Sequence, residues 1–369
     1  MSPGRRATSV VDLIGRKQVV ICAGSGGVGK TTTSAAIATG MADRGLKTAV
    51  LTIDPAKRLA NSLGLTELGN EEARVELPPL ADSAGGEQWA MMLDAKRTFD
   101  ELVHTHAPDD ETRDRVLANP IYQQLSNAVA GSQEYMAMEK LHELHQEGRY
   151  DLLVLDTPPS RNALDFLDAP RRLARFIDSR SLRFFQSTSK VSLGLMGRGT
   201  GMLFSVMKRA TGVDLLRDLS EFFNAFGSMT EGFADRARRV ESLLADSRTT
   251  FLLVASPREA SIQEAEHFAR KLRNDDLPFG GVIVNRVRPV PGAKPSSQLD
   301  SELEGLVGEK LGAKVSRTLG EQVALAGVDA HNLEDLRARL GRRPTLAVPE
   351  LTDDVHDVAG LRALNEYLF

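Results

Sequence analysis

Residues 24–31, Gly-Ser-Gly-Gly-Val-Gly-Lys-Thr, constrain the fold of this chain more than any other stretch. They match the pattern Gly-x-x-x-x-Gly-Lys-Ser/Thr. An apolar, β-branched run typical of a buried strand precedes them at 18–23, and a stretch with helical character follows at 31–44. Glycines in this setting let successive backbone N–H groups face one anion, and the helix N-terminus adds positive potential. The motif and its context therefore predict a phosphate-binding loop.

The loop pattern gives most of its residues a definite task. We expect Lys30 to place its charge on the β- and γ-phosphates of ATP and to act in catalysis. Thr31 is expected to ligate Mg²⁺ through its hydroxyl, and Thr32 to reach the α-phosphate. The other predicted cofactor-binding positions are Gly26, Gly27, Val28 and Gly29. The predicted cofactors are thus ATP and Mg²⁺.

Two other interpretations of the glycines are open. Gly24, Gly26 and Gly29 also satisfy Gly-x-Gly-x-x-Gly, and Asp54 lies about where a dinucleotide-binding fold has its ribose acid. A glycine turn between strand and helix, without any ligand, is the second alternative. Dinucleotide binding has no use for Lys30 and the hydroxyl after it, so ATP binding is favoured.

Three polar residues at the ends of apolar runs are further candidates. We expect Asp54 to orient the attacking water as a catalytic residue, and Asp156 to hold Mg²⁺ through water. Asn285 carries an amide that can pair with an adenine edge. For the aspartates the alternative is a carboxylate that caps the next turn or helix, and for Asn285 an ordinary turn residue.

Apolar runs of strand length alternate with helical stretches along the chain, at 18–23, 47–53, 150–155, 250–255, 281–285 and 346–348. This alternation predicts an α/β fold with a doubly wound, mostly parallel sheet of the P-loop NTPase kind. We expect a single P-loop ATPase domain over residues 1–369. Helical insertions at approximately 96–148 and 171–246 are expected to form a subdomain.

The amino-acid composition indicates which classes of partner and which cellular compartment to expect. The net charge is −4, from 46 basic and 50 acidic residues, and no long block of like charge could follow a phosphate backbone, so no nucleic-acid partner is expected. Cys22 is the single cysteine, which excludes an internal disulfide or a Cys-x-x-Cys metal site within one chain. We find no signal peptide and no apolar stretch long enough to span a membrane. A cytoplasmic protein is expected.

Residues 176–233 are rich in phenylalanine and methionine at helical spacing. One interpretation is a set of apolar stripes packed against the sheet or against other helices. The other is an adaptable groove that holds apolar helices of client membrane proteins. The sequence leaves both open.

The stretches 24–33, 52–59 and 156–159 together resemble the arsenite-pump ATPase family, which includes the ATPases that target tail-anchored proteins. Residues 156–164 are most similar to its bacterial, largely uncharacterised branch. The resemblance implies a deviant Walker A ATPase that works as a dimer closing on ATP, with a helical subdomain for membrane-protein helices. It implies phosphate and Mg²⁺ contacts for Lys30 and Thr31, switch I and II roles for Asp54 and Asp156, and an adenine contact for Asn285.

The sequence departs from that family at two points. Ser25 stands where the family has a signature lysine that reaches the partner's nucleotide, and a serine cannot place a charge on phosphate. The partner is therefore expected to be either a second copy of this chain or a paralogue that supplies the lysine. The cysteines that hold zinc or arsenite in relatives are also absent, so we do not expect direct arsenite sensing.

The favoured function is Mg²⁺-dependent ATP hydrolysis coupled to dimer opening and closing, which would bind and target or chaperone apolar membrane-protein segments. The alternatives are a membrane-positioning or partition-type ATPase, the ATPase subunit of an arsenite-like anion transporter, and a metabolic P-loop enzyme. Membrane positioning is disfavoured because the C-terminal segment is acidic and would be repelled by anionic lipid. Its acids are Asp353, Asp354, Asp357 and Glu366, against Arg362.

Overall fold

The chain forms two compact units in a computed structural model, which describes residues 9–369 apart from 55, 81–83, 121, 124–131, 158–166, 170–229, 294 and 342. The first unit comprises Met1–Met91, Arg149–Ala163 and Ala245–Phe369, and the second comprises Met92–Gly148 and Leu164–Leu244. The single domain with two helical insertions stays a prediction, and of the insertion at 171–246 only residues 230–246 are described. The stripes and groove predicted for 176–233 lie almost wholly outside the described residues.

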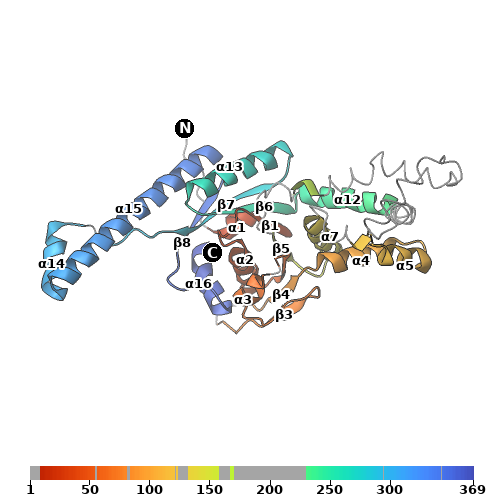
Figure 1. Ribbon diagram of the computed structural model, residues 1–369, viewed down its shortest axis with the longest axis horizontal. Coiled ribbons are helices and arrows are strands. Elements are labelled where there is room, and N and C mark those ends of the chain that lie inside the picture. Colours follow the sequence, from red (N-terminus) through yellow and green to blue (C-terminus); the bar gives the residue numbers. More distant parts are fainter. Residues whose placement is uncertain are drawn as a thin grey trace, which may run out of the picture. The chain divides into compact units, whose positions relative to one another are not determined.

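An eight-stranded sheet forms the centre of the first unit, in the order β3-β4-β2-β5-β1-β6-β7-β8 (Figure 1). Its strands are β1 (Val19–Ala23), β2 (Lys47–Thr52), β3 (Ala73–Val75), β4 (Glu87–Met92), β5 (Leu152–Asp156), β6 (Thr249–Ala255), β7 (Phe279–Val287) and β8 (Thr345–Pro349). Each of the predicted apolar runs overlaps one of these strands. The α/β fold with a mostly parallel sheet is thereby confirmed.

The sequence of the central strands explains their position in the sheet. Every residue of β1, β5 and β6 is buried, because these strands are mostly apolar and are covered on both faces, as parallel strands require. The short pair β3 and β4 is antiparallel and lies at one end of the strand order. We did not predict this pair, since β3 is too short and too polar to give an alternating or apolar pattern.

The helices of the first unit cover both faces of the sheet. In Figure 1, α2, α3 and α16 lie on one side of it, and α13 and α15 lie on the other. Crossovers that leave β1 and β6 in opposite directions must lie on opposite faces if both are right-handed. The helices are α1 (Val10–Ile14), α2 (Lys30–Asp43), α3 (Arg58–Ser62), α13 (Glu259–Asn274), α14 (Ser297–Val307), α15 (Glu309–Leu340) and α16 (Val358–Leu368).

The C-terminal helix α16 packs on α2, the helix that follows the predicted phosphate loop. Arg362 forms an ion pair with Asp43, with Nη2 2.7 Å from Oδ1 and Nε 3.0 Å from Oδ2. The guanidinium of Arg44 lies 3.9 Å from the centre of the Phe369 ring. Paired charges and a cation over a ring therefore fasten the end of the chain to α2.

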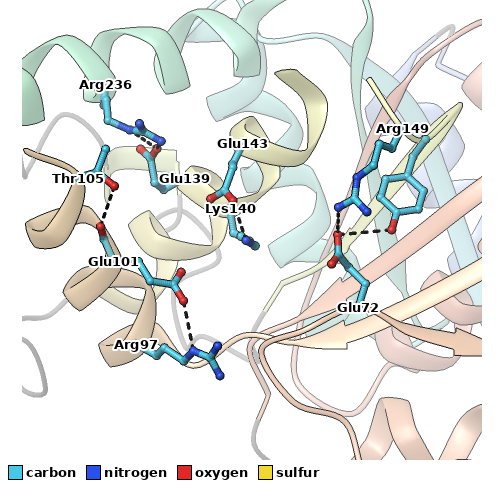
Figure 2. Close-up of polar contacts among 10 residues, drawn as sticks. Glu72, Arg97, Glu101, Thr105, Glu139, Lys140, Glu143, Arg149 and Arg236 are labelled. Carbon is cyan, nitrogen blue, oxygen red and sulfur yellow. Dashed lines mark hydrogen bonds and ion pairs between the residues drawn. The ribbon is translucent and has the colours of Figure 1, made fainter. Parts of the chain in front are cut away.

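The second unit is helical where it is described, with α4 (Ala95–His106), α5 (Asp110–Ala118), α7 (Ser132–Glu147) and α12 (Thr230–Ala245). Glu139 of α7 is fully buried, and Arg236 of α12 pairs with it, as Figure 2 shows. Tyr135 donates a second hydrogen bond to Glu139, at 3.0 Å. A buried carboxylate needs such partners, so this cluster ties α7 to α12.

Helix α15 has two parts with different surroundings. Its 32 residues begin in a hairpin with α14, which has no buried residue, and its C-terminal half contacts α13 and β7. Leu336 is 0% exposed, whereas Leu311 in the N-terminal half is 51% exposed. The free energy of packing is therefore concentrated in the C-terminal half.

Replacing leucine by alanine at these two positions tests this division of α15. Leu336→Ala should lower the free energy of unfolding by about 2–5 kcal/mol, since it leaves a cavity among buried side chains. Leu311→Ala in the N-terminal half should change it by less than about 0.5 kcal/mol. Urea or thermal unfolding measures both, and equal losses would contradict the packing described.

Candidate functional site

The predicted loop joins β1 to α2 and passes close to two neighbouring strands. Gly24 has φ +152, and a Cβ there would lie 2.0 Å from the carbonyl oxygen of Val254 in β6. Gly29 has φ +92, and a Cβ there would lie 2.4 Å from the amide nitrogen of Asn285. At both positions the backbone conformation and the close approach require glycine.

Helix α2 begins without a side-chain cap, as do α3, α13 and α15. Its N-cap is Gly29, which has no side chain to accept from the first-turn N–H groups. By contrast, an aspartate or serine oxygen caps four other helices: α4 through Asp94, α5 through Asp109, α14 through Ser296 and α16 through Asp357. The N-terminus of α2 thus keeps donors and positive potential for an external anion.

Lys30 is buried at the start of α2, and its Nζ donates to the carbonyl oxygen of Ser25 at 2.8 Å. Burial lowers the pKa of Lys30, while the charges of Asp156 and Asp54 oppose that shift. The loop therefore holds a poorly solvated cation, which a polyphosphate would stabilise.

Asp156 lies beneath the loop at the end of β5 and is almost fully buried. Its register partners are Cys22 in β1 and Thr52 in β2, so three strands meet at this carboxylate. Oδ2 accepts from Thr31 Oγ1 at 2.7 Å and from Thr52 Oγ1 at 2.9 Å. Oδ1 has no hydrogen-bond partner in the part of the chain that the structure describes. Burial raises the pKa of Asp156 to about 6, although both threonine hydroxyls act to lower it.

This arrangement fits a hydrated Mg²⁺ ion. The buried Oδ1 of Asp156 is an orphaned hard oxygen, and the Thr31 hydroxyl lies beside the same carboxylate. Mg²⁺ in nucleotide sites is held by one or two such protein groups together with phosphates and water. Among the described residues no group of three or more His, Cys, Asp or Glu side chains could hold a metal alone. The assignment of Thr31 and Asp156 to Mg²⁺ stays a prediction.

Asp54 faces the same region from the end of β2. Oδ1 accepts from the N–H of Ala56 at 3.0 Å, and Oδ2 pairs with Arg58 at 3.1 Å. The first contact is the turn-capping role that we considered as the alternative to catalysis. Asp54, Lys30 and Thr31 nevertheless line one cavity of about 340 Å³ with Thr32. The water-orienting role of Asp54 remains a prediction.

Asn285 ends the apolar part of β7 and contacts the loop directly. Its Nδ2 donates to the carbonyl oxygen of Val28 at 3.0 Å, and its Oδ1 accepts from the N–H of Arg286 at 3.0 Å. It also lines a cavity of about 370 Å³ together with Thr32, Pro349 and Leu351. The predicted adenine contact is not tested by these bonds.

Sequence analysis missed three residues at the site. Thr52 was assigned to a strand and to the 52–59 stretch of the family resemblance but was given no role, yet its hydroxyl donates to Asp156. Arg286 follows Asn285, and its Nη1 lies 3.3 Å from the carbonyl oxygen of Gly27. Glu264 of α13 accepts a hydrogen bond from Ser25. The position of Thr52 just before Asp54 was an available signal, but nothing in the sequence brings Glu264 to Ser25.

A family model described as anion-transporting ATPase matches residues 17–302. The chain belongs to this family. It is therefore an ATPase, which confirms the predicted enzyme class and the resemblance to the arsenite-pump ATPase family. Among the described residues, no helix combines the length and apolarity needed to cross a bilayer.

Individual relatives are distant but long matches. The ATPase GET3 of Malassezia globosa is 25% identical over 350 residues, which cover 95% of this chain and 90% of that protein. The ATPase ARSA2 of Chlamydomonas reinhardtii is 26% identical over 288 residues, or 77% of this chain and 72% of that protein. The putative arsenical pump-driving ATPase 1 of Aquifex aeolicus is 23% identical over 280 residues, or 74% and 64%.

The buried charge of Asp156 predicts a pH-dependent gain in stability on its removal. A carboxyl whose pKa is raised on folding destabilises the native state above that pKa, and the penalty disappears as the pH falls toward the unfolded value. Without nucleotide and Mg²⁺, Asp156→Asn should therefore raise the free energy of unfolding at pH 7.5 by about 1–3 kcal/mol. At pH 4.5 the gain should be small. Thermal unfolding at both pH values measures this, and a gain independent of pH would exclude charge burial as its cause.

Proposed function

We propose that this chain binds ATP with Mg²⁺ at the loop and hydrolyses it to open and close a dimer. The observation that carries this proposal is the placement of Thr31 and the orphaned Asp156 oxygen beside the buried Lys30. One cation and one magnesium-binding pair are what a triphosphate needs at its β- and γ-phosphates. In this proposal Asp54 orients the water, and Asn285 contacts the adenine.

We further propose that nucleotide-driven closure serves to bind and target, or to chaperone, apolar segments of membrane proteins. The support is the resemblance to targeting ATPases and the long match to the ATPase GET3. The ATPase subunit of an anion transporter is the second candidate. It is favoured by the description of the family and by the relative named as an arsenical pump-driving ATPase.

The identity of the dimer partner is argued from residue 25 of the loop. Ser25 supplies no cation, and its hydroxyl is bonded to the Glu264 carboxylate. We therefore propose a heterodimer in which a paralogue supplies the signature lysine, with a dimer of identical chains as the alternative. A transition-state cation at phosphate accelerates hydrolysis by orders of magnitude, so its absence should limit a dimer of identical chains.

ATP turnover by the purified chain tests the core of the proposal. Lys30→Ala should abolish both MgATP binding and hydrolysis, because the loop loses its buried cation. Lys271→Ala is the matched control, since Lys271 of α13 pairs with Asp275 just after that helix and lines neither of the two cavities described above, and it should behave as the unmodified protein. Calorimetry and phosphate release measure the two quantities. Equal activity of Lys30→Ala and the unmodified protein would refute hydrolysis at this loop.

Restoring the missing lysine tests the heterodimer. If the lack of a cation at position 25 limits turnover, Ser25→Lys in the chain alone should raise kcat by about tenfold or more with little change in KM. Glu264→Gln should accompany it in a second variant, so that the new lysine is not held by that carboxylate. Rapid turnover by homodimers of the unmodified chain, with no gain from either variant, would contradict the proposal.

A further inference from the structure

Arg286 has an unusual backbone conformation for its residue type. Its φ is +60, and among the described residues only Lys57 and Asp276 share a positive φ without being glycine. The conformation interrupts the pairing of β7 with β8, whose register shifts between Val284 and Val287. Left-handed backbone is unfavourable for a side chain of this size, and such residues gather at functional sites. Glycine would be less strained here, which points to a use for the side chain.

The side chain of Arg286 reaches the phosphate loop. Nη1 lies 3.3 Å from the carbonyl oxygen of Gly27, while the preceding residue, Asn285, donates to the carbonyl oxygen of Val28 at 3.0 Å. The Asn285 Oδ1 in turn accepts from the N–H of Arg286 at 3.0 Å, which supports the left-handed turn. Two consecutive residues of β7 thus hold two consecutive carbonyls of the loop.

Because of peptide geometry, these two contacts also set the direction of two backbone N–H groups in the loop. In a trans peptide the C=O and the following N–H point in opposite directions. Contacts that hold the carbonyls of Gly27 and Val28 toward β7 therefore direct the N–H groups of Val28 and Gly29 away from it. These are two of the donors that a phosphate-binding loop presents to its anion.

Arg286 also borders three cavities that loop residues line, of about 350, 340 and 370 Å³. The loop has an uncharged residue at Ser25, and its own cation, Lys30, is buried. Arg286 is exposed, so it can keep its contact with the loop without being desolvated.

We propose that Arg286 is a positioning residue of the nucleotide site. It holds the Gly27 carbonyl so that the N–H of Val28 faces the phosphates, and the left-handed backbone at 286 is what brings its guanidinium to the loop. The proposal rests on the proposed binding of ATP at this loop.

Separate measurements of stability and nucleotide affinity distinguish positioning from a structural role. Arg286→Gly removes both the side chain and the strain, so its Tm without nucleotide should stay equal or rise, while its Kd for MgADP should increase about tenfold. Arg286→Lys keeps a donor and should give an intermediate Kd. A merely structural residue would lose Tm and affinity together, and that result would overturn the proposal.

Two controls make the outcome specific. Asp276→Gly relieves a left-handed residue just after α13, away from the loop, so it should keep or raise Tm and leave the Kd for MgADP unchanged. Lys30→Ala tests the proposed function itself. If Lys30→Ala binds MgADP normally, nucleotide binding at the loop is refuted. If Lys30→Ala loses binding but Arg286→Gly keeps the affinity of the unmodified protein, only the positioning role of Arg286 is refuted.

Discussion

The hydrogen bonds from Thr31 and Thr52 to the buried Asp156 carboxylate are the interaction on which the rest of the site depends. They join the first turn of α2 to the ends of β2 and β5, and thereby fix the position of the helix N-terminus relative to the sheet. A buried carboxylate without such donors would be strongly unfavourable, so the two hydroxyls and the acid require one another. The second carboxylate oxygen remains for a ligand because the first accepts both bonds.

The loop is held by a second group of contacts, one from its own Lys30 and two from β7. Lys30 binds the Ser25 carbonyl, and residues at the end of β7 bind those of Gly27 and Val28. All come from sequence positions that parallel strands bring to one edge of the sheet. A glycine-rich loop has few side chains of its own to fix its conformation, so its peptide orientation has to be set by its neighbours. The topology of the sheet is therefore part of the binding site.

The sequence predicted the elements that depend on local signals and missed those that depend on tertiary contacts. The apolar runs and the glycine-lysine motif located the central strands, the loop and α2. The β3–β4 pair carried no pattern, and the loop contact of Arg286 follows from a backbone bulge that no local rule anticipates. For Asp54 a local rule did anticipate the contact, because the turn-capping hydrogen bond that we considered as the alternative to catalysis is present. Residue roles that need a bound nucleotide could be inferred from the motif but not from packing.

Several energetically unfavourable features of the first unit lie around the loop. Lys30 is desolvated, Asp156 has an orphaned oxygen and Arg286 is strained, whereas the strand that leads into the loop, β1, consists of buried apolar residues. Folded proteins tolerate such groups where a ligand uses them. A bound Mg²⁺-nucleotide would bring negative charge to the lysine and a cation to the aspartate. Its binding energy would then offset costs that the free protein already carries. Nucleotide affinity and stability are for this reason linked through the same few side chains.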